Sequence, residues 1–122
     1  MDVKSREEII KFAQKLNSTN LSPLRSGNIS LKAQNNNEEG FLITPSGKKY
    51  DSLKADDIVF VSLEGRYDEK GLQPSSEWRF HKDIYLKKID AKAVVHAHSP
   101  HATAVSAHNK DIPAFHYMIA LA

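Results

Sequence analysis

The sequence contains no cysteine among its 122 residues, and it has no long hydrophobic run. The absence of cysteine excludes a disulfide framework and any metal site built from thiolates. No apolar stretch approaches the ~20 residues of a membrane-spanning helix. The opening segment MDVKSREEII also lacks the apolar core of a secretory signal peptide. A cytoplasmic protein is the resulting interpretation.

The chain also has little excess of either charge, because it contains 17 Lys and Arg residues and 15 Asp and Glu residues, for a formal net charge of +2. This excess is too small to indicate a nucleic-acid-binding protein, and no basic run supports one. A chain of this length forms at most one domain, with a core of modest size. We therefore expect a single domain over residues 1–122.

Helix-type and strand-type hydrophobic patterns alternate along the chain. In the first helix, Ile9, Ala13 and Leu16 share one face, which must pack against another element. The polar turn NNNEEG joins two strands into a predicted hairpin. The alternation is typical of an α/β protein with a mixed sheet covered by helices. The expected helices are residues 5–16, 75–89 and 99–108; the expected strands are 29–33, 41–44, 58–63 and a buried one at 93–98; residues 112–122 form a short strand or lead into a helix.

The segment VVHAHSPH places three of the six histidines close together. Side chains at positions i and i+2 of a strand point to the same face, so His96 and His98 project together from a strand end. Open α/β sheets bind ligands at such an edge, and two imidazoles can chelate one Zn²⁺ ion. The pair could equally hydrogen-bond to water or to the backbone. His101 follows a change of chain direction and is a poor third ligand. The other histidines are interpreted as helix-face or surface residues: His81, His108 and His116.

The segment Ser75-Ser76-Glu77 precedes a predicted helix. Two hydroxyls and the first free amides of a helix form a site suited to phosphate. The charge of Glu77 opposes a phosphate but suits a metal, so Glu77 could complete a metal set with the two histidines. The alternative is that Ser75 is an ordinary helix cap and Glu77 an ordinary residue of the first turn.

Two further segments, SGN at residues 26–28 and TPSG at residues 44–47, supply small and hydroxyl residues in tight turns. Backbone amides in such turns can converge on an oxyanion. Turn formation alone explains the same residues equally well.

In combination, the segments SGNIS, FLITPSGKKY, PSSEWRFH, AVVHAHSPHATAVS and IPAFHYMIA resemble the class II aldolase/adducin family, and in particular its sugar-phosphate aldolases. The resemblance covers essentially the whole chain. It implies a three-layer α/β/α fold with a central mixed, largely antiparallel sheet. Family members are considerably longer, so the domain is expected to be incomplete at its C-terminus.

The resemblance also implies roles for individual residues. Zn²⁺ or a similar divalent ion would be bound by Glu77, His96 and His98, with a third histidine from a later segment that this chain lacks. Glu77 would also transfer a proton. A tyrosine matching Tyr117 would reach the active site of a neighbouring subunit in a homotetramer. The residues matching those that bind the substrate phosphate are Asn28, Ser46, Gly47, Ser75 and Ser76.

The reaction implied is the cleavage of a ketose 1-phosphate into dihydroxyacetone phosphate and an aldehyde. The divalent metal would stabilise the negative charge left on the three-carbon half. We expect the 122-residue chain to be a poor aldolase or an inactive one, because part of the family's metal set is absent. The alternatives are an epimerase or a methylthioribulose-phosphate dehydratase on the same scaffold, or a non-catalytic relative. Epimerases commonly carry Asp where this chain has Glu77, which favours an aldolase.

Overall fold

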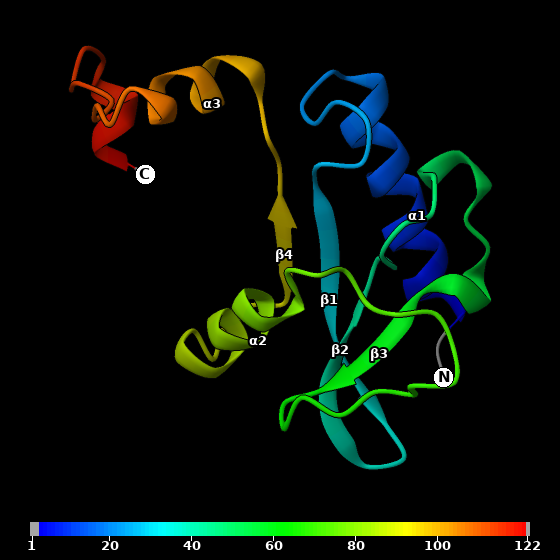
Figure 1. The fold of residues 1–122 in the computed structure, drawn as a ribbon. Helices are drawn as coiled ribbons and strands as arrows, with labels where there is room; N and C mark the ends of the chain where they lie inside the picture. Colours follow the sequence, from blue (N-terminus) through cyan, green and yellow to red (C-terminus); the bar gives the residue numbers. More distant parts are fainter. Residues whose placement is uncertain (1–2, 122) are drawn as a thin grey trace.

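A computed structural model describes residues 3–121 and shows three layers (Figure 1). Helix α1 (Val3–Ser18) covers one face of a four-stranded sheet, and helix α2 (Trp78–Lys87) covers the other. The expected α/β fold is therefore confirmed. The strands of the sheet are β1 (Asn28–Asn35), β2 (Glu38–Ile43), β3 (Val59–Ser62) and β4 (Ala93–His96).

The strands lie in the order β3-β2-β1-β4, and every pairing within residues 3–121 is antiparallel. β1 and β2 form the predicted hairpin, with Asn36 and Asn37 as its loop. These two residues have φ angles of 49° and 65°. Asparagine tolerates this left-handed region, and two such residues in succession suit the turn of a tight hairpin.

Alternation along β2 divides the core into two parts. Leu42 points toward α1 and packs with Ile9, Ala13 and Leu16 of that helix. Its neighbours Phe41 and Ile43 point toward α2. Burial of each such large side chain stabilises the fold by about 1.5–3 kcal/mol. The residues of the α2-facing part are Phe41, Ile43, Val59, Val61, Trp78 and Tyr85.

Two helices begin at other residues than the sequence predicts. α1 begins at Val3, before Ser5, and α2 begins at Trp78 rather than after a cap at Ser75. The N-cap of α2 is Glu77, and its side chain makes no capping hydrogen bond. The late start of α2 follows from its preceding segment, because Pro74 is held in an isolated β-bridge with Pro45.

The strand expected at residues 93–98 is shorter than predicted and is not buried. β4 ends at His96, so His98 lies in the segment that follows it. β4 is at the edge of the sheet and pairs only with β1 among the described residues, which leaves Val95 61% exposed. The prediction took a continuous apolar run as a sign of burial on both faces, and that was wrong here.

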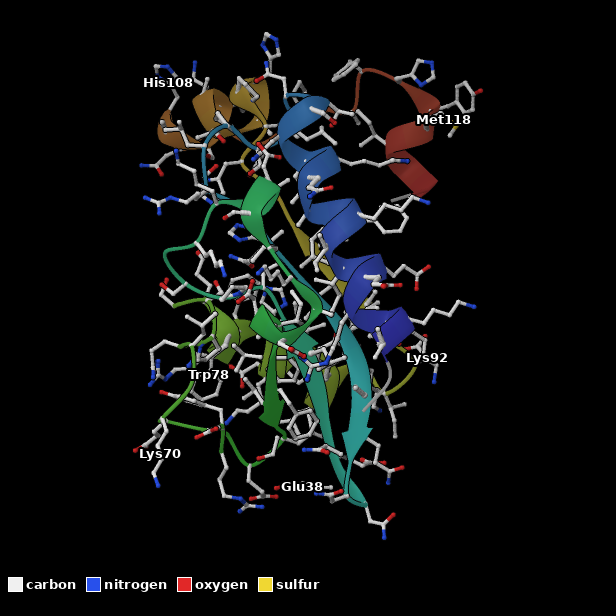
Figure 2. The ribbon with its side chains drawn as sticks, turned by 90° about the vertical axis from the view of Figure 1, so that its right-hand side faces the viewer. Glu38, Lys70, Trp78, Lys92, His108 and Met118 are labelled. Carbon is white, nitrogen blue, oxygen red and sulfur yellow. The ribbon has the colours of Figure 1, made fainter. Side chains whose placement is uncertain are left out.

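The remaining segments lie mostly at the periphery. Helix α3 (Pro100–Ala107) has Ser99 at its N-cap and Pro100 at its first position, as predicted, and all its residues are exposed. Figure 1 shows α3 beyond the end of β4, away from the sheet. In Figure 2, Glu38 marks the hairpin end of the molecule, and His108 and Met118 mark the other end. The short 3₁₀ helices are η1 (Tyr50–Ser52), η2 (Ala55–Asp57) and η3 (Tyr117–Leu121).

No helix within residues 3–121 has the length and apolar character needed to cross a membrane.

Candidate active site

The antiparallel register brings four separate segments to one end of the sheet. Asn28 at the start of β1 pairs with His96 at the end of β4, and Ser30 pairs with Ile43 at the end of β2. The turn TPSG follows β2 directly. Its neighbour is the segment before α2, because the amide of Ser46 donates a hydrogen bond of 2.9 Å to the carbonyl of Gln73.

Glu77, His96 and His98 each offer one ligand atom, and these atoms all lie within 4.8 Å of one another. Nδ1 of His96 is 2.9 Å from Oε2 of Glu77. Although they are buried, Nδ1 of His96 and Nε2 of His98 make no hydrogen bond of good geometry within the described residues. Buried ring nitrogens without partners are the groups that a cation would satisfy.

This donor set fits a borderline divalent metal. Two imidazoles and one carboxylate form one of the three-ligand sets that hold catalytic zinc while leaving a fourth position for water or substrate. All three side chains are partly exposed, so an ion and a substrate can reach them. The three residues whose convergence the sequence suggested are thus brought together.

Contacts with Ser22, Gly27 and Phe80 fix the positions of the two histidines. The buried Ser22 Oγ accepts a hydrogen bond of 3.0 Å from the amide of His98. The edge of the Phe80 ring packs on His96, with ring centroids 5.0 Å apart. Gly27 lies so close to β4 that a Cβ there would be 2.6 Å from the carbonyl oxygen of His96. The glycine of SGN is therefore required by this close approach of two backbones.

All five residues that the resemblance matches to phosphate binding line one cavity of about 270 Å³. Glu77 and His98 line the same cavity, so it adjoins the metal set. Gly47 has a φ of 75°, which explains the glycine at the end of TPSG. The five residues are Asn28, Ser46, Gly47, Ser75 and Ser76.

The cavity also contains cationic residues that the sequence analysis did not identify. Arg25 lines it, and its Nη1 donates a hydrogen bond of 2.6 Å to the carbonyl of Gly47. Lys48 lines it as well, but pairs with Asp57 at 2.6 Å. Arg25 directly precedes the SGN turn, whose amides were expected to bind an oxyanion. A cationic residue next to such a turn was the signal in the sequence that could have identified Arg25. A larger cavity, of about 580 Å³, contains none of the predicted site residues.

The helix amides contribute less to anion binding than the sequence suggested. The amide of Trp78 donates to the carbonyl of Ser75, and that of Phe80 donates to the carbonyl of Glu77. The first bond closes the turn that precedes α2, and the second lies in the first turn of the helix itself. Side-chain hydroxyls and the guanidinium of Arg25 are therefore the groups in this part of the cavity that are suited to an anion.

His81 lies on the inner face of helix α2 and is fully buried, so of the two interpretations, helix face or surface, the surface one was wrong. Burial, with a smaller contribution from His96, lowers the pKa of His81 to about 4. The ring lies on the face of α2 that also carries Trp78 and Tyr85. Its spacing from these two aromatic residues, three and four positions, was the available signal.

Tyr117, the residue expected to act in a neighbouring subunit, is not among the residues that line this cavity. Its side chain is 74% exposed in η3, and its ring packs on His116. His101 and His108 are exposed as well.

Comparison with known proteins agrees with this geometry. The sequence profile of the Class II Aldolase and Adducin N-terminal domain matches residues 7–122. The chain belongs to the class II aldolase and adducin family. Its expected resemblance to the sugar-phosphate aldolases of this family is also confirmed by the curated relatives, which include L-fuculose phosphate aldolases.

Two relatives show how much of a class II aldolase this chain contains. It is 44% identical over 119 residues to the L-fuculose phosphate aldolase of Escherichia coli K12, covering 98% of this chain and 53% of that protein. It is 42% identical over 117 residues to a 5-methylthioribulose-1-phosphate/5-deoxyribulose-1-phosphate aldolase of Rhodospirillum rubrum, covering 96% of this chain and 51% of that protein. The chain thus spans about half the length of these relatives.

Solved structures of class II aldolases share the fold. An L-fuculose 1-phosphate aldolase superposes with a TM-score of 0.87 at 35% identity, covering 98% of this chain and 56% of that chain. The l-fuculose-1-phosphate aldolase of Thermus thermophilus gives a TM-score of 0.71 at 30% identity, covering 88% of this chain and 52% of that chain.

Proposed function

We propose that the chain forms the metal- and phosphate-binding part of an aldolase that cleaves a ketose 1-phosphate into dihydroxyacetone phosphate and an aldehyde. One observation carries the proposal: Glu77 and His98 belong both to the metal-ligand set and to the wall of the cavity that the five phosphate-binding candidates line. A molecule with a phosphate at one end and oxygens on the adjacent carbons could occupy both parts at once.

The cavity residues would bind and orient the phosphate. The hydroxyls of Ser46, Ser75 and Ser76 would donate hydrogen bonds to phosphate oxygens, and the guanidinium of Arg25 would supply positive charge. The side-chain amide of Asn28 has two N–H groups, of which one donates to Glu77, so the other remains for the substrate. Fixing the phosphate would hold the reacting carbons against the metal set.

Glu77, His96 and His98 would hold Zn²⁺ or a similar divalent ion, which when bound polarises the ketose carbonyl and stabilises the negative charge that develops beside it. Glu77 would move the proton at carbon through a carboxylate oxygen. In the condensation direction, Tyr117 of a neighbouring subunit in a homotetramer would donate its hydroxyl proton to the aldehyde oxygen, and in the cleavage direction the resulting phenolate would take that proton back from the sugar hydroxyl.

The names of the relatives support this substrate class. L-Fuculose phosphate and the 1-phosphates of 5-methylthioribulose and 5-deoxyribulose are the compounds that those names give. The three compounds share the phosphorylated ketose end and differ in the aldehyde half. We therefore propose the shared end as the part that this chain recognises.

The proposal is tested by titrating the purified chain with Zn²⁺ in a calorimeter, and then with inorganic phosphate. Binding of both ligands is expected, and His96→Ala and His98→Ala should each remove zinc binding. His96 does not line the cavity, so His96→Ala should leave phosphate binding intact. His108→Ala is the matched control because His108 is exposed and outside the cavity. A folded wild-type chain that binds no zinc would refute the metal-dependent function and favour a non-catalytic role.

Activity is a separate measurement. Release of dihydroxyacetone phosphate from L-fuculose 1-phosphate and from 5-deoxyribulose 1-phosphate can be followed with a coupled dehydrogenase. We expect turnover that is low compared with a full-length relative assayed under the same conditions.

A further inference from the structure

A continuous line of hydrogen bonds runs from Glu77 into the core beneath α2. Nδ2 of Asn28 is 2.5 Å from Oε2 of Glu77, and Oδ1 of Asn28 is 2.5 Å from Nε2 of His81. Nδ1 of His81 is 2.7 Å from Oγ of Ser30, which in turn is 2.8 Å from the hydroxyl of Tyr85. Five side chains from β1, α2 and the turn before α2 are thus connected.

The carboxylate of Glu77 determines the direction of every bond in this line. An ionised carboxylate only accepts, so Asn28 presents its N–H to Glu77 and its oxygen to His81. His81 must then donate from Nε2, which makes Nδ1 of the neutral ring an acceptor. Ser30 donates to that Nδ1, and Tyr85 donates to Ser30. The line therefore has one self-consistent polarity.

Four of the five side chains in this line are buried, although all of them are polar. His81 and Ser30 are 0% exposed, Asn28 is 3% exposed and Tyr85 is 2% exposed. The ring of Phe80 packs against His81 with centroids 4.5 Å apart. A buried polar network with all its members paired is rigid, whereas a broken one leaves costly unpaired groups. Burial also keeps His81 neutral, with its pKa lowered to about 4, and raises the pKa of Tyr85 to about 12.

We propose that His81 is a positioning residue for the metal set: through Asn28, it holds the carboxylate of Glu77 in the orientation that binds the ion. The proposal rests on the proposed metal-binding function. Because Asn28 occupies one lone-pair direction of Oε2, the remaining directions of the carboxylate face His96, His98 and the cavity. A neutral His81 anchors Asn28 without adding a positive charge that would repel a cation.

Two substitutions of His81 distinguish a role in positioning Glu77 from a role in filling the core. His81→Gln keeps a terminal N–H that can reach Asn28, whereas His81→Phe keeps the ring volume but removes the donor. Outer partners of metal ligands typically contribute about 10- to 100-fold to metal affinity. We expect His81→Phe to weaken Zn²⁺ binding by about that factor, and His81→Gln to stay within about threefold of the wild type.

The experiment is a calorimetric Zn²⁺ titration of the three folded proteins, repeated with Co²⁺ while its visible absorption reports the ligand geometry. If His81→Phe binds Zn²⁺ as tightly as the wild type with an unchanged Co²⁺ spectrum, His81 has no positioning role. If the wild type binds neither ion, it is the proposed function that fails. Should His81→Phe not fold, Ser30→Ala takes its place, and unchanged zinc affinity in that variant would overturn the proposal.

A second readout does not depend on any metal. Two-dimensional ¹⁵N–¹H NMR of the imidazole groups in the metal-free chain should show the proton of His81 on Nε2, and Ser30→Ala should disturb this tautomer. A proton on Nδ1 in the wild type would contradict the derived polarity and overturn the proposal.

Discussion

The backbone amide of Ser75 donates a hydrogen bond of 3.0 Å to the carbonyl of Thr44. This bond joins the turn after β2 to the turn before α2, although the two lie far apart in the sequence. It places Ser46 and Gly47 in the wall of the same cavity as Ser75 and Ser76. The phosphate-binding candidates therefore form one site only when both turns are docked.

Removal of one hydroxyl from this site should weaken phosphate binding. Ser76 is exposed and lines the cavity, so Ser76→Ala should leave the fold intact. A hydrogen bond to a charged group contributes about 1.5–3 kcal/mol, which corresponds to at least about a tenfold loss of affinity. Calorimetry with inorganic phosphate measures it. The control is Ser106→Ala in α3, where the exposed hydroxyl donates to the carbonyl of Thr103 and does not line the cavity. Equal affinity in both variants would exclude Ser76 from the site.

Neutralisation of Glu77 should abolish most of the metal affinity. Glu77→Gln preserves the shape of the side chain but removes the anionic ligand, and its effect should exceed the about 10- to 100-fold typical of outer partners. Metal content after dialysis and a Zn²⁺ titration measure the loss. Glu64→Gln is the matched control, because Glu64 is exposed and does not belong to the ligand set. Retention of zinc by Glu77→Gln would remove Glu77 from the set.

Gly27→Ala should destabilise the fold. The added Cβ would lie 2.6 Å from the carbonyl oxygen of His96 and 2.7 Å from Oγ of Ser22, so one of these groups must move. Overpacking of this kind typically costs about 1–3 kcal/mol. Urea denaturation followed by circular dichroism measures the change in the free energy of unfolding. The control is Gly71→Ala, where the atom nearest to the added Cβ is 3.7 Å away. If Gly27→Ala is as stable as this control, the backbone around Gly27 can move to accommodate the Cβ at no cost, and the prediction is wrong.

Stability should rise with pH between about 4 and 6.5, and His81 should account for part of the rise. In the unfolded chain this histidine has its ordinary pKa of 6.5, whereas burial lowers the pKa to about 4 in the fold. The unfolded state therefore binds more protons in this window, and the contribution is present above pH 6.5 and lost as the pH falls toward 4. Its full size is about 3 kcal/mol.

Urea denaturation across this pH range, for the wild type and His81→Gln, measures the His81 contribution. The variant should show a shallower dependence, since its other titrating groups are the same. Parallel curves for the two proteins would mean that His81 does not become protonated on unfolding in this window.

The general fold was predictable from local patterns, whereas the complete ligand set and the phosphate-binding candidates were implied by the resemblance to a known family. The segment 41–44 was predicted as the second strand of a hairpin, and Ile9, Ala13 and Leu16 indicated a helix that packs against another element. The hydrogen bond between Asn28 and His81 was not predictable, because it connects residues that are 53 positions apart. The exposure of β4 was missed as well, since an apolar run does not indicate which strand lies at an edge.

The pairing of β1 with β4 has a consequence for how the protein folds. β1 meets β2 through a two-residue loop, a local contact that can form within microseconds. β1 and β4 are separated in the sequence by β2, β3 and α2, so their pairing closes a long loop, and pairing between such distant segments is slow. His96 lies at the end of β4 and His98 directly after it, so both histidines reach the site only when β4 pairs with β1. We therefore expect zinc to bind after the hairpin has formed. Stopped-flow refolding in the presence of a zinc indicator would reveal this order as a lag between the two signals.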